Sequence, residues 1–295
     1  MTPVHGYAPD VDLSPQELRL LVAVARSGSF TAAGANMGLT QSAVSHAIRT
    51  CERRIGALLF ERGRTGARPT PAGDRVLVHA RQILRQHEVM RTEALDAAAG
   101  SVSGTLRIAA FRTAAMYLLP PAVERLSTRY PQLVMRVAIV PEIGAGTAGA
   151  VAAGHADVAL ATFPAGAAVP PHSGELMVEP YFLVHPSGQD ARNLPLIDWP
   201  ENCSSYTRAW WDRQTWLPQA RVEVDADDGV VLSMVAQGIG MAILPQLTLT
   251  SLPPGVTVVP LDDDPPTRRI MHVTTEAAKH SMAVRELIRE LRAGR

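Results

Sequence analysis

Cysteine is scarce in this sequence of 295 residues, which contains only Cys51 and Cys203. Two cysteines without a CxxC pair exclude the disulfide framework of a small secreted domain. We expect both to be small buried hydrophobic residues, with a redox switch as the alternative. The nine histidines are scattered, with no HxH or HxxxH pair. Because metal sites need ligands at such close spacings, the sequence predicts no metal site.

Long apolar runs are absent as well, and no segment has the roughly 20 apolar residues that a membrane-spanning helix needs. The first residues, MTPVHGYAPDVD, lack the basic start and apolar core of a secretion signal. We therefore expect a cytoplasmic protein without membrane partners. Neither sign of charge is in excess, since 28 lysines and arginines balance 28 aspartates and glutamates. A length of 295 residues with 46% hydrophobic residues predicts one small and one larger folded unit.

Enzyme motifs are nearly absent. The sequence has no GxSxG nucleophile elbow, phosphate-binding P-loop or HExxH metal motif. One exception is GAGTAG at residues 144–149, which matches the GxGxxG dinucleotide-binding pattern after an expected strand. A nicotinamide-dependent oxidoreductase is therefore an alternative function. However, the next strand ends in Thr162-Phe163-Pro164 without the acidic residue that binds a ribose, so we expect no enzyme and no cofactor.

Residues 31–70 carry the most informative pattern, two short helical segments around a glycine turn followed by an arginine-rich loop. Thr40 is suited to cap the second helix, and we expect Ala43, Ala47 and Ile48 to face inward. No carboxylate, which phosphate would repel, occurs in this helix before Glu52. The spacing predicts an outer face of side chains that can contact base edges or phosphates, namely Gln41, Ser42, Ser45, His46 and Arg49.

Two further helices are expected to support this one. Ser14 and Glu17 have the spacing of a capping box, with Pro15 at the first helical position. Residues 30–37 are mostly small or apolar, and we expect Thr31 to cap this segment. A glycine at residue 38 then allows the sharp turn between two helices. Three small helices can close on a common core in this way.

A basic hairpin is expected after these helices. Residues 58–68 read LLFERGRTGAR, with two glycines and three arginines in a short loop. Between residues 41 and 70 there are six arginines and two glutamates, a local balance of +4 (6 − 2). Arginine suits contacts to phosphates and grooves, so we expect Arg62, Arg64 and Arg68 to reach the DNA backbone or minor groove. The alternative is an ordinary solvated hairpin.

Together these residues resemble the winged helix-turn-helix of LysR-type transcriptional regulators. The matching elements are Ser29-Phe30, Ala32-Ala33, QSAVS at 41–45, LFER at 59–62 and TPAG at 70–73. Three residues depart from the usual pattern: Cys51 replaces leucine, His46 stands where arginine is frequent, and Pro69 replaces an apolar residue. The resemblance implies a sequence-specific regulator that binds double-stranded DNA. We include Ser29, Thr31 and Thr40 among the expected DNA contacts.

Residues 71–100 are expected to form a linker helix that follows the DNA-binding domain of residues 13–70, itself preceded by a tail at residues 1–12. Apolar positions recur with heptad spacing at Val76, Ala80, Ile83, His87, Met90 and Ala94. A lone helix of this kind favours pairing with a second chain, and the alternative is packing on its own C-terminal domain. A homodimer would place two DNA-reading helices on two-fold related half-sites. The resemblance implies the same dimer, often assembled into a tetramer.

From residue 101 strands and helices alternate, which predicts an α/β domain with a parallel sheet. We expect strands at 105–111, 133–140, 157–163 and 268–275, helices at 114–130 and 277–292, and further elements at 179–185, 221–224, 229–238 and 240–244. The resemblance implies two Rossmann-like subdomains arranged like a periplasmic binding protein. We place the first at 101–164 and 265–295, and the second at 165–264. Core or interface packing is expected for Trp199, Trp210, Trp211 and Trp216.

A small-molecule effector is expected between the subdomains, because ligands of open α/β sheets bind at the carboxyl ends of strands and at helix N-termini. Arg112 and Thr113 follow the first strand, and the resemblance implies that Thr113 contacts the effector. Alternatively, Thr113 only caps its helix and Arg112 pairs with a surface acid. Further candidates are Glu142, Gly144, Thr162, Phe163, Tyr206 and Thr207. Glu142 disfavours an anion, so the ligand class stays open. A solute-binding protein that never contacts DNA is a third hypothesis.

Overall fold

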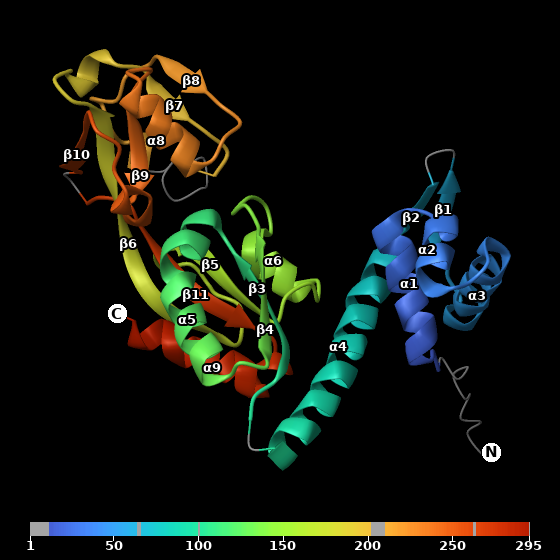
Figure 1. The fold of residues 1–295 in the computed structure, drawn as a ribbon. Helices are drawn as coiled ribbons and strands as arrows, with labels where there is room; N and C mark the ends of the chain where they lie inside the picture. The colour runs from blue at the N-terminus through green and yellow to red at the C-terminus, as the bar shows by residue number, and fades with distance from the viewer. Residues whose placement is uncertain (1–11, 64–65, 100, 202–209, 262–263, 295) are drawn as a thin grey trace, which may run out of the picture. The chain divides into compact units, whose positions relative to one another are not determined.

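The computed structural model describes residues 12–63, 66–99, 101–201, 210–261 and 264–294. The chain forms two compact units, Met1–Leu95 and Asp96–Arg295, whose elements are labelled in Figure 1. Each unit has its own hydrophobic core. A smaller and a larger unit agree with the expectation from length, while the finer domain limits stay predictions.

Three short helices form the body of the smaller unit: α1 (Pro15–Ser27), α2 (Phe30–Met37) and α3 (Gln41–Ile55). The expected capping box at the start of α1 is present, and Thr40 caps α3 as expected. Ser29 caps α2 by accepting a hydrogen bond from the N–H of Ala32 at 3.3 Å. The expectation that Thr31 caps this helix is wrong, because Thr31 already lies inside the first turn.

The core of the smaller unit collects apolar side chains from all three helices. α3 contributes Val44, Ile48 and Cys51, each fully buried. The expected inward position of Ala43 is wrong, since Ala43 is exposed and Val44 points into the core. Burial raises the pKa of the Cys51 thiol to about 11, which agrees with a buried hydrophobic role for this cysteine. Cys203 lies outside the described residues.

A two-stranded wing follows α3, with β1 (Phe60–Gly63) antiparallel to β2 (Gly66–Pro69). The hairpin lies close against the end of α1, where the N–H of Ala67 donates to the carbonyl oxygen of Gly28 at 2.7 Å. A Cβ atom at Gly66 would lie 2.2 Å from that same carbonyl oxygen, and its φ angle is +109°. Glycine at position 66 therefore permits both the turn and the close contact.

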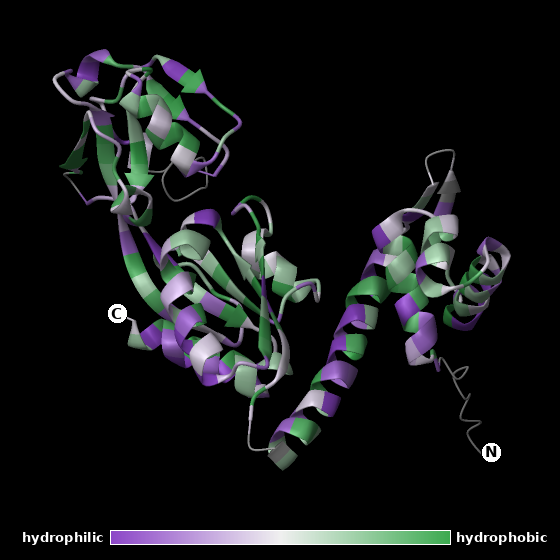
Figure 2. Ribbon diagram, in the orientation of Figure 1, coloured by the Kyte–Doolittle hydropathy of each residue, from purple (hydrophilic) through white to green (hydrophobic). Residues whose placement is uncertain are grey.

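A long helix, α4 (Pro71–Ala99), completes this part of the chain and ends in the second unit. Its first turns pack into the core of the smaller unit through Leu77 and Ala80, with Val76 half-buried beside them. Farther along, Ile83 is 53% exposed and Met90 is 63% exposed. Figure 2 shows hydrophobic residues interspersed with hydrophilic ones along this helix. The positions with heptad spacing in α4, which we call the seam, therefore divide into two groups. The first group packs into the core of the smaller unit, and the second is exposed and open to a partner.

The larger unit is built on one mixed sheet of order β10-β6-β11-β5-β3-β4, with β9 paired to β6. The expected parallel arrangement is correct for β3 (Gly104–Ala110), which pairs with β4 (Leu133–Ile139) and β5 (Val158–Pro164). It is wrong for β11 (Thr267–Thr274), which runs antiparallel to both β5 and β6 (Ser173–Pro186). The larger unit has two parts, and we call the part with β3, β4, β5 and β11 the first part. It also contains a short π-helix, η1 (Ala114–Leu118), then α5 (Leu119–Arg129), α6 (Gly146–Ala152), η4 (Ala278–His280) and α9 (Met282–Ala293).

β6 joins the two parts of the larger unit because its first half pairs with β11 and its second half pairs with β9 (Ala242–Pro245) and β10 (Val256–Pro260). The second part adds η2 (Ala191–Asn193), β7 (Leu196–Asp198), β8 (Arg221–Glu223), α8 (Asp228–Ala236) and η3 (Gln246–Thr250). Separate apolar clusters lie on the two halves of β6.

Three tryptophans of the second part are buried and Trp216 is half-buried, as expected for core packing. Trp199 belongs to one apolar cluster, and Trp210 and Trp211 belong to another, with Trp216 packed against it. Among the described residues, no helix is both long enough and apolar enough to cross a bilayer.

Candidate nucleic-acid interface and ligand cleft

The N-terminal half of α3 presents a polar surface. Gln41, Ser42, His46 and Arg49 are all exposed, as expected. Thr40 and Ser42 are joined by a hydroxyl–hydroxyl contact of 3.0 Å, so the first turn of the helix carries an ordered polar edge. The first carboxylate along the helix, Glu52, is engaged by the wing, since its Oε1 accepts from the N–H groups of residues 59 and 60. The surface is thus rich in donors without a free acid among residues 40–51.

Ser45 departs from the expected outward set, because it is only 4% exposed. Val44, Ile48 and Cys51 define the buried face of α3, and Ser45 lies at the edge of that face. The expected inward position is wrong for Ala43 but not for Ala47, which is half-buried and packs against the core of the smaller unit. The carbonyl of Ser45 accepts from Nε of Arg49 at 3.3 Å, which lays the arginine stem along the helix.

The wing supplies further candidate contacts. Arg68 is exposed on β2, opposite Glu61 in the antiparallel register. Arg64 lies outside the described residues, and the side chain of Arg62 is likewise not described. Ser29 is half-buried at its cap, whereas Thr31 and Thr40 are exposed. The structure therefore brings the α3 residues, Thr31 and the capping Thr40 into one small domain with the wing.

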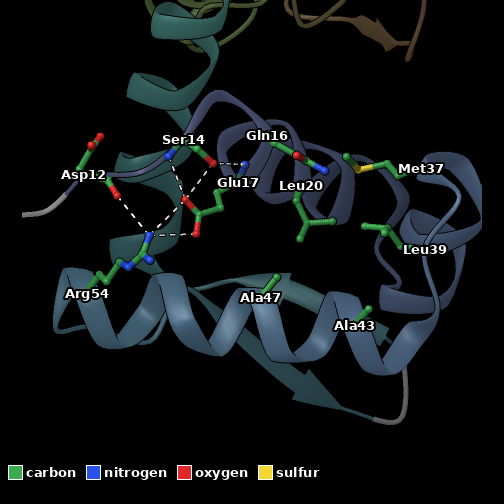
Figure 3. A pocket seen from close by; sticks show the side chains of 10 residues that line it. All are labelled: Asp12, Ser14, Gln16, Glu17, Leu20, Met37, Leu39, Ala43, Ala47 and Arg54. Atoms are coloured by element: carbon green, nitrogen blue, oxygen red, sulfur yellow. Dashed lines mark hydrogen bonds and ion pairs between the residues drawn. The ribbon is translucent and has the colours of Figure 1, made fainter.

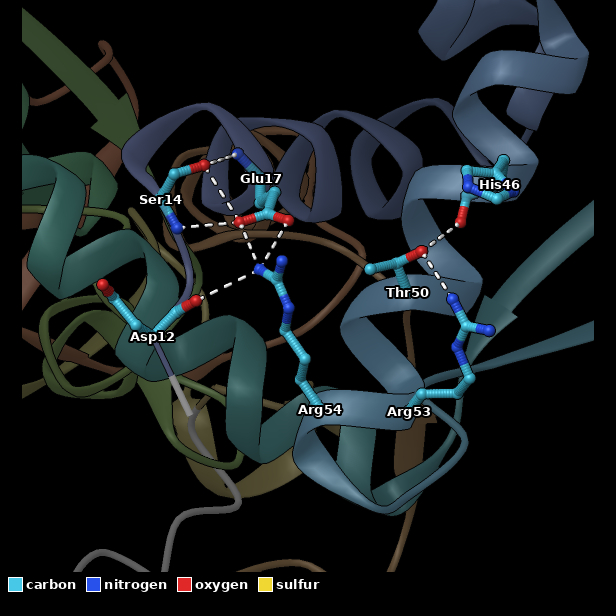
Figure 4. A network of polar contacts seen from close by, with 7 residues as sticks. All are labelled: Asp12, Ser14, Glu17, His46, Thr50, Arg53 and Arg54. Carbon is cyan, nitrogen blue, oxygen red and sulfur yellow. Dashed lines mark hydrogen bonds and ion pairs between the residues drawn. The ribbon is translucent and has the colours of Figure 1, made fainter. Parts of the chain in front are cut away.

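Polar contacts fix α3 against α1 (Figure 4). Arg54 Nη1 donates to both carboxylate oxygens of Glu17, at 3.0 and 3.2 Å, and to the carbonyl of Asp12. The pKa of Glu17 is lowered, first by the backbone N–H of Ser14 and also by Arg54. Arg53 donates to Thr50 Oγ1 at 3.1 Å on the neighbouring face. The contacts of Arg54 therefore hold α3 against the start of α1, whereas the Arg53–Thr50 contact lies within α3.

An open groove of about 760 Å³ lies between α1, α2 and α3 (Figure 3). Leu20, Met37 and Leu39 line one side of it, while Ala43 and Ala47 line the α3 side. The Glu17–Arg54 pair closes one end. Ala43 thus faces the groove, whereas Ala47 lines the groove and also packs against the core of the smaller unit.

The larger unit contains a second site, which we call the ligand cleft. It lies where the two parts of the unit meet and is lined by Phe111, Arg112, Thr113, Glu142, Tyr181, Glu201, Asp228, Pro245 and Arg268. Of the expected effector residues, Arg112, Thr113 and Glu142 line this cleft. Thr162 reaches it indirectly, by donating to Glu142 Oε2 at 3.3 Å. Tyr206 and Thr207 lie outside the described residues.

Two expected effector residues do not line the ligand cleft. Gly144 is exposed in the loop before α6, with a φ angle of +62°. Phe163 packs against a separate apolar cluster that includes Val151. Gly144 follows the end of β4 and Phe163 lies in β5, but neither is part of the cleft lining.

The structure bears on two alternatives from the sequence, namely that Thr113 only caps its helix and that Arg112 pairs with an acid. Thr113 makes no side-chain capping bond, so it does not cap its helix. It is 4% exposed, and its Oγ1 has no hydrogen-bond partner among the described residues. Arg112 does pair with an acid, since its Nε lies 3.0 Å from Oδ2 of Asp227.

Buried charge surrounds the same cleft. Arg268 Nε donates to Oε2 of the fully buried Glu179 at 2.6 Å. Its guanidinium also lies 5.0 Å from the ring centre of Phe111 and 5.8 Å from that of Tyr181. No sequence pattern indicated Arg268 or Tyr181 as cleft residues. By contrast, Glu201 follows β7, where the rule on carboxyl ends of strands could have found it.

The GAGTAG segment does not form a dinucleotide site. The N-terminus of α6, where a pyrophosphate would bind, is next to the carboxylate of Glu142, which accepts from the N–H of Thr147 at 3.2 Å. A second anion at this helix end would be repelled. The motif match is therefore explained by a turn and a short helix.

Comparisons with known proteins agree with this division. Residues 15–74 match the bacterial regulatory helix-turn-helix protein domain of the lysR family, and residues 99–295 match the LysR substrate binding domain. A protein of Synechococcus elongatus, described as probable HTH-type transcriptional regulator LrrA, is 34% identical over 252 residues. This similarity spans 81% of the present chain and 83% of the relative.

Solved structures show the same fold. A full-length OxyR variant from Pseudomonas aeruginosa matches with a TM-score of 0.71 at 20% identity, over 95% of each chain. Full-length CbnR in complex with its target DNA matches with a TM-score of 0.67 at 18% identity, over 96% of this chain and 100% of that one. With both units matched, the chain belongs to the LysR family, whose members are DNA-binding transcriptional regulators with an effector-binding domain and not enzymes.

Proposed function

We propose that this protein binds double-stranded DNA through α3 and the wing, as a homodimer whose geometry responds to a small molecule in the ligand cleft. The observation that carries the DNA-binding part is the exposed set of Gln41, Ser42, His46 and Arg49 with no free carboxylate among them. Direct readout by Ser45 is not included, because its side chain is buried. We place this activity in the cytoplasm, where the chromosome of a bacterial regulator lies.

The dimer is supported by α4. Ile83 and Met90 are large apolar side chains on one side of the helix, and both are more than half exposed. Burying them against the same helix of a second chain would remove this apolar surface from water. Two copies of α3 would then contact two-fold related half-sites. CbnR, solved with its target DNA, is similar over nearly the whole chain, and pairing of two such dimers into a tetramer is part of the proposal.

Control by an effector is supported by the ligand cleft, which lies between the two parts of the larger unit that β6 joins. A ligand that binds one arrangement of these parts more tightly than another shifts the population toward that arrangement. Such a shift is the coupling that an effector-dependent regulator requires.

Salt-dependent binding to a mixed-sequence DNA duplex tests the proposal. We expect fluorescence anisotropy to show an affinity that falls as salt rises, because phosphate contacts release counterions. Arg49→Ala should weaken binding and lower the salt slope by about 1 if the guanidinium contacts a phosphate. Arg285→Ala removes an equally exposed arginine from the larger unit and should change neither. Binding that is insensitive to salt, or equal effects of the two changes, would contradict the proposal.

A further inference from the structure

An open groove along the second half of α3 carries two exposed arginines. The groove has a volume of about 670 Å³ and is lined by residues of α3 from His46 onward and by the turn before the wing, up to Leu58. We call it the α3 groove. Arg49 and Arg53 both line it and both are exposed. Arg49 is already a candidate DNA contact, whereas Arg53 lies outside the candidate set.

Arg53 continues the polar stripe of the DNA-reading face. His46, Arg49 and Arg53 follow one another at spacings of three and four residues, which places them on one side of the helix. The seven residues from His46 to Arg53 span about 10 Å along the helix axis. A reading helix contacts base edges with its N-terminal residues, in a major groove about 12 Å wide. A side chain two turns farther along the helix therefore lies near the edge of the groove, where the phosphates are.

Hydrogen bonds hold Arg53 on this stripe, as Figure 4 shows. Thr50 Oγ1 donates to the carbonyl oxygen of His46 at 3.1 Å, which uses the single proton of this hydroxyl. The same oxygen accepts from Nη2 of Arg53, also at 3.1 Å. Thr50 therefore directs the guanidinium along the helix toward His46 and leaves most of its N–H donors for a ligand.

The charge of Arg53 is available to such a ligand. Within the described part of the chain, Arg53 has no ion-pair partner, whereas its neighbour Arg54 is engaged by Glu17 at 3.0 Å. Glu52 is the acid in the groove lining, and its Oε1 accepts from the N–H groups of residues 59 and 60. A guanidinium stays charged, and its planar fork matches two oxygens of a phosphate. The α3 groove therefore favours an anion.

We propose that the α3 groove holds the sugar–phosphate backbone of the DNA beside each half-site, with Arg53 bound to a phosphate and Thr50 positioning its guanidinium. This assignment rests on the proposed function, because it places the backbone next to the bases that the start of α3 reads. Charge complementarity selects this occupant, since the lining presents two guanidinium groups and turns its carboxylate to the wing. Arg53 adds affinity that does not depend on base sequence, because every phosphate carries the same charge.

Fluorescence anisotropy of the full chain on two duplexes of equal length tests this assignment, one of mixed sequence and one of alternating adenine and thymine. We expect Arg53→Ala to weaken binding to both duplexes by the same factor, up to about eightfold at about 0.1 M salt, and to lower the salt slope by about 1. Arg285→Ala, at an exposed position of the larger unit, is the matched control and should change neither. An unchanged Tm shows that each variant is folded.

Thr50→Val tests the positioning role, because valine has nearly the shape of threonine but no hydroxyl. We expect this change to weaken DNA binding in the wild-type background and to have no further effect in Arg53→Ala. Thr50→Ser, which keeps the hydroxyl, should restore most of the affinity that Thr50→Val loses. The same loss from Thr50→Val in both backgrounds would show that Thr50 does not act through Arg53.

An unchanged salt slope in Arg53→Ala, or a loss on only one of the two duplexes, would overturn the assignment. A larger loss for Leu58→Ser than for Arg53→Ala would overturn it as well, because Leu58 is 71% exposed in the groove lining and would then mark an apolar contact. The wild type also separates the two claims. Absence of salt-dependent binding to either duplex contradicts the proposed function, whereas such binding weakened by Arg49→Ala and not by Arg53→Ala contradicts only the role of the α3 groove.

Discussion

Glu52 shows how a single residue can serve the fold of a DNA-binding surface. A carboxylate beside the reading face of α3 would repel phosphate if it were free. Instead its Oε1 accepts from the N–H of Leu59 at 2.9 Å and from that of Phe60 at 3.2 Å. The acid therefore fixes the start of the wing relative to α3 and satisfies two backbone donors.

Replacement of Glu52 by alanine is expected to reduce both stability and DNA binding. Two partly buried N–H groups would lose their acceptor, which costs about 1–3 kcal/mol in the free energy of unfolding. Chemical denaturation measures this cost, and anisotropy measures the weaker DNA binding that follows from a less fixed wing. Glu93→Ala, at an exposed position of α4, is the control. Unchanged stability in Glu52→Ala would show that the two hydrogen bonds are unimportant.

At this scale the sequence predicted much of the DNA-binding surface. Thr40 as a cap and exposed Gln41, His46 and Arg49 follow from helical spacing alone. Ser45 was placed wrongly, because small residues such as Ala43 are compatible with either side of a helix. Only the packing of Val44 against α1 and α2 sets the rotation of α3, and that contact is tertiary.

Among the elements, α4 has two roles along its length. Its first turns complete the core of the smaller unit through Leu77 and Ala80. The heptad spacing does not distinguish these positions from Ile83 and Met90, which remain exposed. The sequence therefore predicted the seam but not the point at which it passes from the core to a free surface.

A charge at the exposed part of the seam should weaken the dimer. Ile83→Glu would place a carboxylate, together with its symmetry mate, in the proposed apolar contact. We expect sedimentation velocity to show a dissociation constant at least about tenfold higher. Thr92→Glu introduces the same charge two and a half helical turns away, on the opposite side of α4, and should leave the dimer intact. An unchanged dissociation constant for Ile83→Glu would place the dimer contact elsewhere.

The sheet of the larger unit shows a different limit. Alternating strands and helices correctly predicted β3, β4 and β5 as a parallel group. The direction of β11 was not predictable from that pattern, because a strand buried on both faces has the same composition in either direction. Its antiparallel pairing with β5 and β6 follows from the long connections that carry the chain through the second part and back.

Across the whole molecule, the ligand cleft depends on residues that are far apart in the sequence. Thr113 and Glu142 could be suggested from strand ends, but Asp228 and Arg268 come from a helix start and a strand start that meet them only after folding. The cleft also contains a carboxyl group that titrates near neutral pH. Burial and the neighbouring Asp228 raise the pKa of Glu201 to about 7.

The free energy of unfolding should therefore fall as pH rises from about 4.5 to about 7. The pKa of Glu201 is raised from its ordinary value of 4.5 to about 7 in the folded protein, so the folded state holds one proton more than the unfolded chain in this range. Chemical denaturation at several pH values measures this slope, which Glu201→Gln should reduce and Glu175→Gln, at an exposed position of β6, should not. The same pH slope in wild type and Glu201→Gln would contradict this role of Glu201.

Selection of duplexes from a random library by the full chain, followed by sequencing, shows whether two copies of α3 read one two-fold related DNA site. We expect an enriched sequence with two inverted half-sites centred about one helical turn, or a multiple of it, apart. Gln41→Ala should relax base preference within each half-site without changing their spacing. Failure to enrich any sequence, or enrichment of a single half-site without a symmetric partner, would show that two copies of α3 do not read such a site together.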